Sequence, residues 1–365
     1  MHIAIDARAL NSSTGTVLRM LLPHLQRLGS AHRFTVILDE NSRGSWTPSA
    51  DNFSIAYVDA PHFSMAVQTR LLKLLNSLKP DLVWFFMPEQ PLLYRGRVVT
   101  MFHDFTMQKW PTPETKNRLR FYLKFPIGHL VYRAAASKST LIVCPSNYTR
   151  DELLARYRID PARVRTVYNG AEITHDRLES YKHGFRRFLL YVGLHGWHKN
   201  VRRLCEAHQK MLAGNPDLGL IFVGKIDRFV EQTRQWCEAE GMRNILFTGF
   251  LPDAQRDWLY SEAAAYVFPS LAEGFGLPGI EAMGRRTPVV SSNATCLPEI
   301  YGDAASYFDP EDVADMVRAI EIVLNDAALR QDLIERGTRQ AARYSYERMA
   351  RELLDVFADA GASAA

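Results

Sequence analysis

Residues 266–281, YVFPSLAEGFGLPGIE, join a strand-like run to a glycine-rich loop and the start of a helix. Tyr266–Pro269 is short and apolar, as a buried strand would be. Gly274 and Gly276 allow the backbone to approach a ligand closely, and Pro278 suits the first turn of a helix. This order is typical of an α/β domain, in which ligands bind beyond the carboxyl ends of parallel strands.

The same alternation of short apolar runs and helical-period segments continues along almost the whole chain. It predicts parallel sheets with helices on both faces, that is, doubly wound domains. The polar stretch 171–187 interrupts the pattern and predicts an interdomain linker. The expected strands are His2–Asp6, Phe34–Leu38, Ser54–Val58, Leu82–Phe86, Val98–Phe102, Leu141–Cys144, Val164–Val167, Phe188–Gly193, Leu220–Val223, Ile245–Phe247, Tyr266–Pro269 and Val289–Ser291.

The bulk properties favour a protein of two domains that handles anionic ligands. The chain has 365 residues, a net charge of +4 and a pI near 8.8, which is too mildly basic to indicate nucleic acid. Four cysteines without CxxC spacing predict buried free thiols in a reducing compartment. We find no signal peptide and no membrane-spanning apolar run, so we expect a cytoplasmic protein or one on the inner face of the membrane.

Two glutamates frame the glycine-rich loop. A helix beginning near Leu277 would direct its free N–H groups toward a phosphate. Glu273 precedes that helix and Glu281 lies one turn inside it, so each carboxylate is placed to accept hydrogen bonds from hydroxyl groups of a sugar or a ribose. The alternative is an ordinary loop with one solvated and one capping glutamate.

A second candidate segment, residues 191–200, also follows a strand. Lys199 lies in a loop with Gly193 and Gly196, where it could reach a diphosphate as a compact cation. Asn200 is expected to cap the next helix. The alternative for Lys199 is a solvated surface lysine.

The remaining candidates are weaker. His103, beside Asp104 at a strand end, could bond a substrate hydroxyl, although a lone histidine is more often structural. Gly15 could bring backbone N–H groups to a phosphate, but its loop has no GxGxxG fingerprint, which disfavours NAD. The loops containing Gly224 and Phe250–Leu251 suit a base-binding slot or plain turns.

Together these segments resemble the family 4 retaining glycosyltransferases of the GT-B fold, in which two Rossmann-like domains face each other across a cleft. The resemblance covers nearly the whole chain. It includes Glu-x7-Glu at Glu273/Glu281, the Gly193/Lys199/Asn200 element, the pair His103/Asp104, and the segments at 145–147, 169–170, 297–300 and 302–304. It implies an acceptor-side domain 1–172, a donor-binding domain 173–343, and a last helix, about 344–362, that packs back on the first domain.

The resemblance also implies the role of each residue. Lys199 neutralises the donor diphosphate, helped by the backbone at Gly15 and by the N–H groups of the loop Gly274, Phe275, Gly276 and Leu277. Glu273 and His103 orient the transferred sugar, and Glu281 holds the ribose. The segments at Gly193, Gly224, Phe250 and Leu251 complete the donor site, those at Gly224, Phe250 and Leu251 contacting the base.

The chain departs from the family pattern in two loops. The first loop offers one glycine where many relatives have two. His195 and His198 stand where many relatives place an arginine, which predicts donor binding that weakens as pH rises and histidine loses its proton.

The implied activity is transfer of a hexose from a nucleotide diphosphate sugar, with GDP-mannose slightly favoured, to a saccharide or lipid-linked acceptor in cell-envelope polysaccharide or lipopolysaccharide synthesis. No DxD-type pair follows a strand, so we expect no protein-bound metal and no cofactor. Basic and aromatic residues at 116–126, continuing to Arg133, favour either an anionic membrane surface or a helix packed on its own domain. Two alternatives remain: a non-catalytic nucleotide-sugar-binding subunit, or another GT-B enzyme such as a sugar-nucleotide epimerase or a phosphorylase.

Overall fold

The computed structural model describes residues 1–109, 118–171 and 178–362, and these form two compact units. Unit 1 comprises Met1–Gly170 with Ser345–Ala365, and unit 2 comprises Ala171–Tyr344. The expected domain boundary at 172/173 lies outside the described residues.

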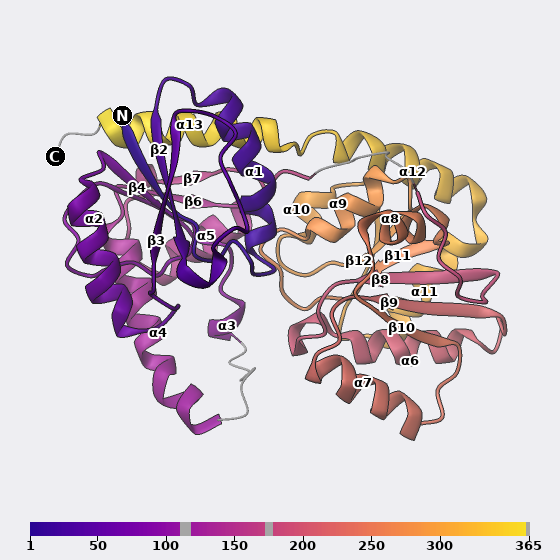
Figure 1. Cartoon of the computed structure of the whole chain (residues 1–365). Coiled ribbons are helices and arrows are strands. Elements are labelled where there is room, and N and C mark those ends of the chain that lie inside the picture. Colours follow the sequence, from indigo (N-terminus) through magenta and orange to yellow (C-terminus); the bar gives the residue numbers. More distant parts are fainter. Residues whose placement is uncertain (110–117, 172–177, 363–365) are drawn as a thin grey trace. The chain divides into compact units, whose positions relative to one another are not determined.

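Unit 1 is built on a parallel sheet that has seven strands within the described residues, in the order β3-β2-β1-β4-β5-β6-β7 (Figure 1). Its central strands β1, β4 and β5 are buried throughout and mostly apolar, because helices cover both faces of such sheets. The strands are β1 (His2–Asp6), β2 (Arg33–Asp39), β3 (Phe53–Val58), β4 (Leu82–Phe85), β5 (Val98–Met101), β6 (Leu141–Cys144) and β7 (Val164–Thr166).

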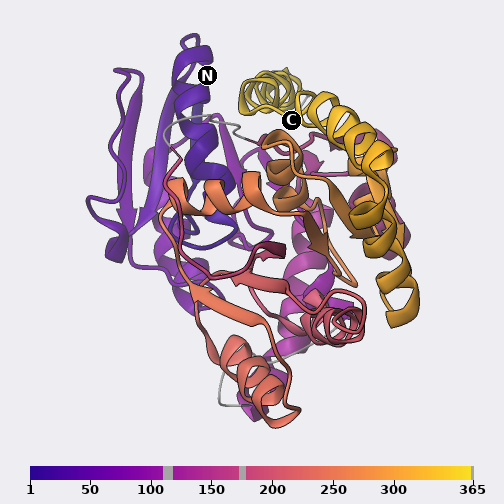
Figure 2. The same cartoon turned by 90° about the vertical axis from the view of Figure 1, so that its right-hand side faces the viewer.

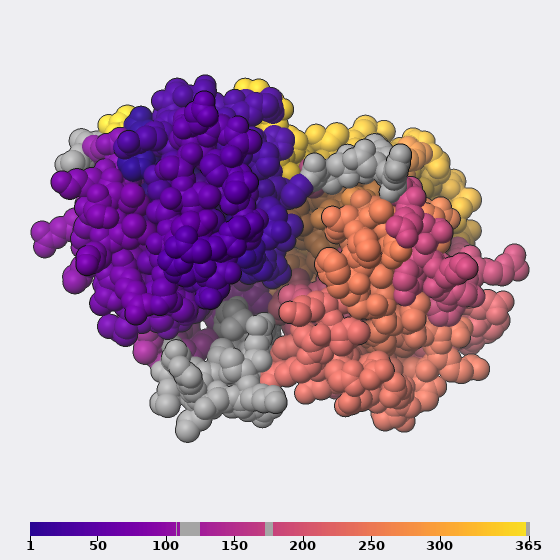
Figure 3. Space-filling view, in the orientation of Figure 1, coloured from indigo at the N-terminus to yellow at the C-terminus, as the bar shows by residue number. Residues whose placement is uncertain are grey.

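The helices of unit 1 come from both ends of the chain. They are α1 (Gly15–Leu28), α2 (Leu72–Leu78), α3 (Thr106–Lys109), α4 (Arg118–Lys138), α5 (Asn147–Arg156) and α13 (Tyr346–Ala362). α13 packs against α1, where Arg27 pairs with Glu347 at 2.6 Å. In Figure 3 the yellow surface of α13 accordingly lies next to the indigo surface of the N-terminal residues. Of the basic and aromatic segment 116–126, residues 116–117 lie outside the described residues. The side chains of residues 118–124 lie outside them too.

Unit 2 contains a second parallel sheet, six-stranded in the described part, in the order β10-β9-β8-β11-β12-β13. Helices α11 and α12 pack against its last strand (Figure 2). The elements are β8 (Arg187–Val192), α6 (Val201–Met211), β9 (Leu218–Val223), α7 (Arg228–Ala239), β10 (Ile245–Gly249), α8 (Asp253–Glu262), β11 (Ala265–Phe268), α9 (Leu277–Gly284), β12 (Val289–Ser292), α10 (Leu297–Tyr301), β13 (Ala305–Phe308), α11 (Val313–Asn325) and α12 (Ala327–Ala341).

The expected α/β class with two Rossmann-like domains is therefore confirmed, and one strand was missed. The missed strand, β13, has four residues, Ala-Ser-Tyr-Phe, and none of them is Val, Ile or Leu, so it lacks the aliphatic run by which the other strands were recognised. The four cysteines are buried free thiols, as expected. Among the described helices, none combines the length and apolar character needed to cross a membrane.

Candidate functional site

The strand order of unit 2 reverses between β8 and β11, and the loops that follow these two strands carry the strongest candidates. Chains leaving neighbouring strands at such a switch point diverge and leave a crevice for ligands. Lys199, from the loop after β8, and Glu273, from the loop after β11, form an ion pair with Nζ 2.6 Å from Oε1. Their side chains are 19% and 13% exposed, so both can be reached from solvent. The fold thus brings together two residues separated by 74 positions in the chain.

Glycine backbones bring together the loops that follow β8, β9 and β10 in the same unit. A Cβ on Gly224 would lie 2.3 Å from the carbonyl oxygen of Gly193, so the loops after β8 and β9 touch through their backbones. Gly193 has φ +146°, a conformation that side chains other than glycine rarely adopt. Gly224 in turn donates its N–H to the carbonyl of Gly249, 3.1 Å away, at the end of β10. Both predicted glycines are therefore required locally.

The first turn of α9 follows Glu273 directly. Gly276 precedes the helix at φ +90°, and none of the described side chains caps its N–H groups. The carbonyl of Gly276 accepts a hydrogen bond from Tyr301 Oη at 2.6 Å. A Cβ at Gly279 would come within 2.3 Å of the same hydroxyl. This helix end is consequently held in place from behind. Within its first turn, Pro278 has no N–H, and the N–H of Gly279 donates to the carbonyl of Gly276 at 3.2 Å.

Glu281 lies on the half-buried face of α9. Its Oε2 accepts a hydrogen bond from Tyr260 Oη at 3.2 Å. Burial raises the pKa of this carboxyl group, and the nearby guanidinium groups of Arg256 and Arg285 partly oppose that rise. The carboxylate therefore has cationic neighbours in the same unit.

Asn200 differs from its expected role. Its backbone does precede α6, in the left-handed conformation with φ +57°, but its side chain does not cap that helix. Instead, Nδ2 donates to the carbonyls of Pro269 (3.0 Å) and Pro310 (2.7 Å). The capping expectation was wrong: Nδ2 binds two carbonyls at the ends of β11 and β13, and Oδ1, the atom that could accept a helix N–H, accepts from Arg203 Nη1 at 3.1 Å instead. Asn200 thereby fixes the backbone next to Lys199.

Two further residues support Glu273 and were missed from the sequence. Thr295 Oγ1 accepts the backbone N–H of Glu273 at 3.1 Å, and Cys296 Sγ donates to its carbonyl at 3.2 Å. They lie more than 20 residues further along the chain, after β12. Thr295 adopts the left-handed conformation at φ +55°, but this is a property of the folded backbone and could not be recognised in the sequence.

Comparisons with known proteins agree with this geometry. A model of "Glycosyl transferases group 1" matches residues 175–340, and one of "Glycosyltransferase Family 4" matches residues 14–175. O-antigen chain mannosyltransferase B of Escherichia coli is 30% identical over 274 residues, which cover 72% of this chain and 70% of that protein. The chain belongs to the family 4-type glycosyltransferases of the GT-B fold.

A second relative and a solved structure are similar. O-antigen chain mannosyltransferase RfbU of Salmonella typhimurium is 27% identical over 260 residues, covering 71% of this chain and 68% of that protein. Sucrose-phosphate synthase of Thermosynechococcus elongatus has a TM-score of 0.78 at 15% identity and covers 98% of both chains. At that identity the structural match supports the fold alone.

The charge expected of His195 in this glycosyltransferase is wrong. The residue is 4% exposed, and its ring packs edge-on against Tyr191 and Phe222 and lies 5.8 Å from Phe247. Burial lowers the pKa of His195 to about 4. Its imidazole is therefore neutral over the whole range in which we expected it to help bind a diphosphate.

The predicted base-contacting residues differ from each other in exposure. Phe250, after β10, is 79% exposed, whereas Leu251 is buried. The ring of Phe250 is therefore open to solvent, whereas the side chain of Leu251 is largely covered by the protein.

His103 and Gly15 belong to unit 1. His103 Nε2 donates to the carbonyl of Phe86 at 2.8 Å, which leaves Nδ1 as an acceptor, and burial lowers the pKa of this half-buried histidine. Gly15 is required sterically, because a Cβ there would lie 2.0 Å from the carbonyl oxygen of Ala9. Its N–H donates to Ser12 Oγ at 3.0 Å, so a phosphate at Gly15 would compete with that hydroxyl.

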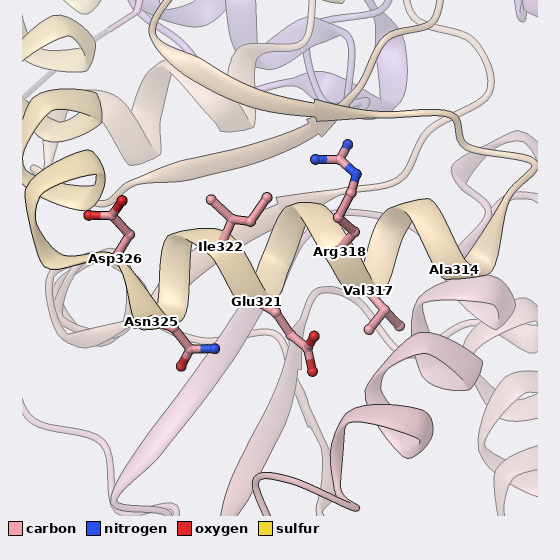
Figure 4. A pocket seen from close by; sticks show the side chains of 7 residues that line it. All are labelled: Ala314, Val317, Arg318, Glu321, Ile322, Asn325 and Asp326. Carbon is pink, nitrogen blue, oxygen red and sulfur yellow. The ribbon is translucent and has the colours of Figure 1, made fainter.

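A hollow of about 540 Å³ lies on α11 of unit 2, and none of the predicted site residues lines it. Its side chains project in different directions from one helix and do not converge on a point (Figure 4). Arg318 is paired with Asp315, and Asp326 caps Leu329. Among the described residues, no three His, Cys, Asp or Glu side chains are grouped to hold a metal. The lining residues are Ala314, Val317, Arg318, Glu321, Ile322, Asn325 and Asp326.

Proposed function

We propose that this glycosyltransferase transfers mannose from GDP-mannose, with retention of the anomeric configuration, to a saccharide or lipid-linked acceptor in cell-envelope polysaccharide synthesis. The proposal is supported by relatives that are named O-antigen chain mannosyltransferases. The observation that carries it is the ion pair between Lys199 and Glu273 at the switch point of unit 2, with Glu273 in the loop that leads into α9.

In this proposal the donor diphosphate takes the place of Glu273 as the partner of Lys199. Lys199 is held by a single carboxylate and remains 19% exposed, so an incoming diphosphate with more negative charge can displace that carboxylate. The backbone at Gly274, Phe275, Gly276 and Leu277 supplies the helix end for the same phosphates. Gly15 is proposed as a further backbone contact.

The displaced Glu273 is then free to accept hydrogen bonds from hydroxyl groups of the transferred sugar. His103, with Nδ1 as an acceptor, is proposed to bind another sugar hydroxyl. Glu281 is proposed to hold the ribose. Gly193 is proposed as a further donor contact, and Gly224, Phe250 and Leu251 are proposed to line the base slot.

The proposed reaction needs no group other than donor and acceptor. The acceptor hydroxyl oxygen forms the new bond to the anomeric carbon on the face from which the diphosphate departs. The bond from that carbon to the diphosphate oxygen breaks, and the departing oxygen takes the hydroxyl proton. Lys199 and the first turn of α9 stabilise the negative charge that develops on the leaving group. We propose that no protein-bound metal and no cofactor take part, so turnover should persist in EDTA.

A donor screen tests this proposal. Thermal shifts of the whole chain would be compared with GDP-mannose, UDP-glucose, ADP-glucose and dTDP-glucose, followed by NMR of the product anomer. The largest shift with GDP-mannose and a product that keeps the donor's α configuration are expected. Preference for another nucleotide, or an inverted product, would contradict the proposal.

We further propose that the protein works at the cytoplasmic face of the cell membrane, where a lipid-linked acceptor would be presented. The described part of α4 exposes Ile127 (57%) and Leu130 (66%). Flotation with anionic liposomes at low salt tests this part, and protein that stays with the soluble fraction would contradict it.

A further inference from the structure

Two of the buried thiols of unit 2 lie on neighbouring helices. Helices α6 and α7 pack against each other (Figure 1), and each carries a cysteine on its buried face, Cys205 on α6 and Cys237 on α7. Cys205 is completely buried, and Cys237 is 4% exposed. The S–H group of Cys205 donates a hydrogen bond to the sulfur of Cys237. Two thiols in such contact need only a small movement to form a disulfide, in which the sulfur atoms are about 2 Å apart.

A cation lies close to these thiols. The guanidinium carbon of Arg202, on the same helix as Cys205, is 5.2 Å from the centre of the Trp236 ring, on the same helix as Cys237. The hydrogen bond from Cys205, together with the charge of Arg202, outweighs burial and lowers the pKa of Cys237. Burial raises the pKa of Cys205 well above its usual value. Cys237 is therefore the thiol that favours the thiolate, the form that reacts with oxidants.

The other two cysteines differ from this pair. The thiol of Cys296 donates to the carbonyl of Glu273 at 3.2 Å, and burial raises the pKa of Cys296 and that of Cys144 in unit 1. Both therefore remain protonated, and a buried thiol in that state is inert.

The position of Cys237 gives an oxidant a way to its sulfur. Cys237 lies in the last turn of α7, where the neighbouring residues Glu238 and Ala239 are exposed. Helix ends open at a much lower free energy than the core of a domain. A small uncharged oxidant such as hydrogen peroxide thus requires the opening of one helical turn and not the unfolding of unit 2.

We propose that Cys205 and Cys237 form an oxidation site, at which hydrogen peroxide converts the two thiols into a disulfide that links α6 to α7. The thiolate of Cys237 attacks one peroxide oxygen and the O–O bond breaks, which leaves a sulfenic acid on Cys237 and releases hydroxide. The sulfur of Cys205 then attacks the sulfur of Cys237, the S–O bond breaks, and a second hydroxide leaves. The two hydroxide ions take up the two thiol protons, so two thiols and one peroxide give one disulfide and two water molecules.

The disulfide links two helices that begin directly after loops of the proposed donor site. Lys199 precedes the start of α6 at Val201, and Gly224 precedes the start of α7 at Arg228. Drawing the two sulfur atoms to bonding distance shifts the helices that carry these loops. The disulfide should therefore lower donor use severalfold, and reduction should restore it. This consequence rests on the function proposed above, whereas the disulfide itself does not.

Peptide mapping of the native chain after treatment with hydrogen peroxide tests the site. In the wild type we expect a disulfide that joins the peptide of Cys205 to that of Cys237. Cys205→Ala should stop at a sulfenic acid on Cys237, which dimedone traps, and Cys237→Ala should leave Cys205 as a thiol. Cys144→Ala is the matched control and should form the same disulfide as the wild type. Free thiols at both positions of the oxidised wild type, or a disulfide through Cys144 or Cys296, would overturn the proposal.

The rate of oxidation tests which thiol reacts first. Arg202→Met removes the cation that favours the Cys237 thiolate, so the disulfide should form severalfold more slowly. Arg234→Met is the control, because Arg234 is 51% exposed on α7 and is paired with Glu231; its rate should equal that of the wild type. Equal rates in both variants would contradict the assignment of Cys237 as the attacking thiolate.

Donor assays on the same samples separate this inference from the proposed function. Hydrolysis of GDP-mannose without acceptor should fall in the oxidised wild type, recover with dithiothreitol, and be insensitive to peroxide in Cys237→Ala. If the reduced wild type uses no donor but the disulfide forms, the proposed function fails and the oxidation site stands. If donor is used and no disulfide forms, the oxidation site fails alone. Equal hydrolysis by the oxidised and the reduced wild type would overturn the effect on the donor site.

Discussion

The switch points of the two sheets occupy the same place in similar folds, but their charged side chains differ in burial and in the number of their contacts. In unit 1, where the strand order reverses between β1 and β4, Arg8 and Asp6 are at most 2% exposed, and the guanidinium is fully engaged by a carboxylate and a carbonyl. In unit 2, Lys199 and Glu273 are joined by a single contact and remain 19% and 13% exposed. The first arrangement is a rigid scaffold, whereas the second can exchange partners when a ligand arrives.

The N-terminal ends of the helices near the two switch points also differ in whether a side chain binds their N–H groups. At the start of α1 the N–H of Gly15 is already bound by Ser12 Oγ. At the start of α9 none of the described side chains forms a cap. A helix end kept without a side-chain cap is available to an anion, and the contrast is therefore in keeping with the phosphate contact proposed at α9.

The largest expected effect is on the unit 1 scaffold. Arg8→Met leaves two buried carboxylates, those of Asp6 and Glu89, without their cation, and the free energy of unfolding should fall by about 3–5 kcal/mol. Urea denaturation measures this. Arg43→Met is the control, since Arg43 is 60% exposed and should change stability by no more than about 0.5 kcal/mol. A similar small loss in both variants would show that these buried charges are not a scaffold.

The next effect is on catalysis in unit 2. Lys199→Ala should reduce sugar transfer by a factor that corresponds to about 2–4 kcal/mol of transition-state stabilisation, as for loss of a comparable electrostatic donor. The measurement is kcat/KM for the donor. Lys210→Ala, on the exposed side of α6, should retain wild-type turnover. Normal turnover in Lys199→Ala would contradict the proposal that Lys199 stabilises the leaving diphosphate.

Acid should destabilise unit 2 through two buried histidines. Burial lowers the pKa of both His195 and His208 to about 4, below the unfolded value of about 6.5. The unfolded chain therefore binds more protons between these values, and the stabilisation present above pH 6.5 is lost as pH falls toward 4.

At pH 5 each histidine should lower the free energy of unfolding by roughly 2 kcal/mol relative to neutral pH. Urea denaturation at pH 7 and pH 5 measures the loss, and His195→Phe, which keeps an aromatic ring in the same packing, should remove about half of the part due to these two groups. An unchanged pH dependence in that variant would mean that His195 is protonated in the folded protein.

The smallest effect concerns the helix ends. Ser12→Ala removes the acceptor of the Gly15 N–H, so the free energy of unfolding should fall by about 1 kcal/mol, as for loss of a helix cap. Ser13→Ala, one residue further along on the exposed side of the same loop, is the control. Equal stability of the two variants would indicate that the start of α1 is no better capped than that of α9.

The sequence alone determined the order of elements and the loops that carry the candidate residues. Central strands of a parallel sheet are covered on both faces and so must be apolar, which made all but the edge strand β13 recognisable. Because the carboxyl end of each strand is defined by its own local sequence, Lys199, Glu273 and His103 could be placed at strand ends without any long-range information.

Only the tertiary structure decided which groups meet and which are buried. Nothing near Lys199 in the sequence shows that its partner is Glu273, and nothing near Asn200 shows that it binds Pro269 and Pro310. His195 follows a strand just as Lys199 does, yet it is buried among aromatic rings and uncharged. Pairing and desolvation depend on atoms supplied by distant segments, and these contacts exist only once the chain has folded.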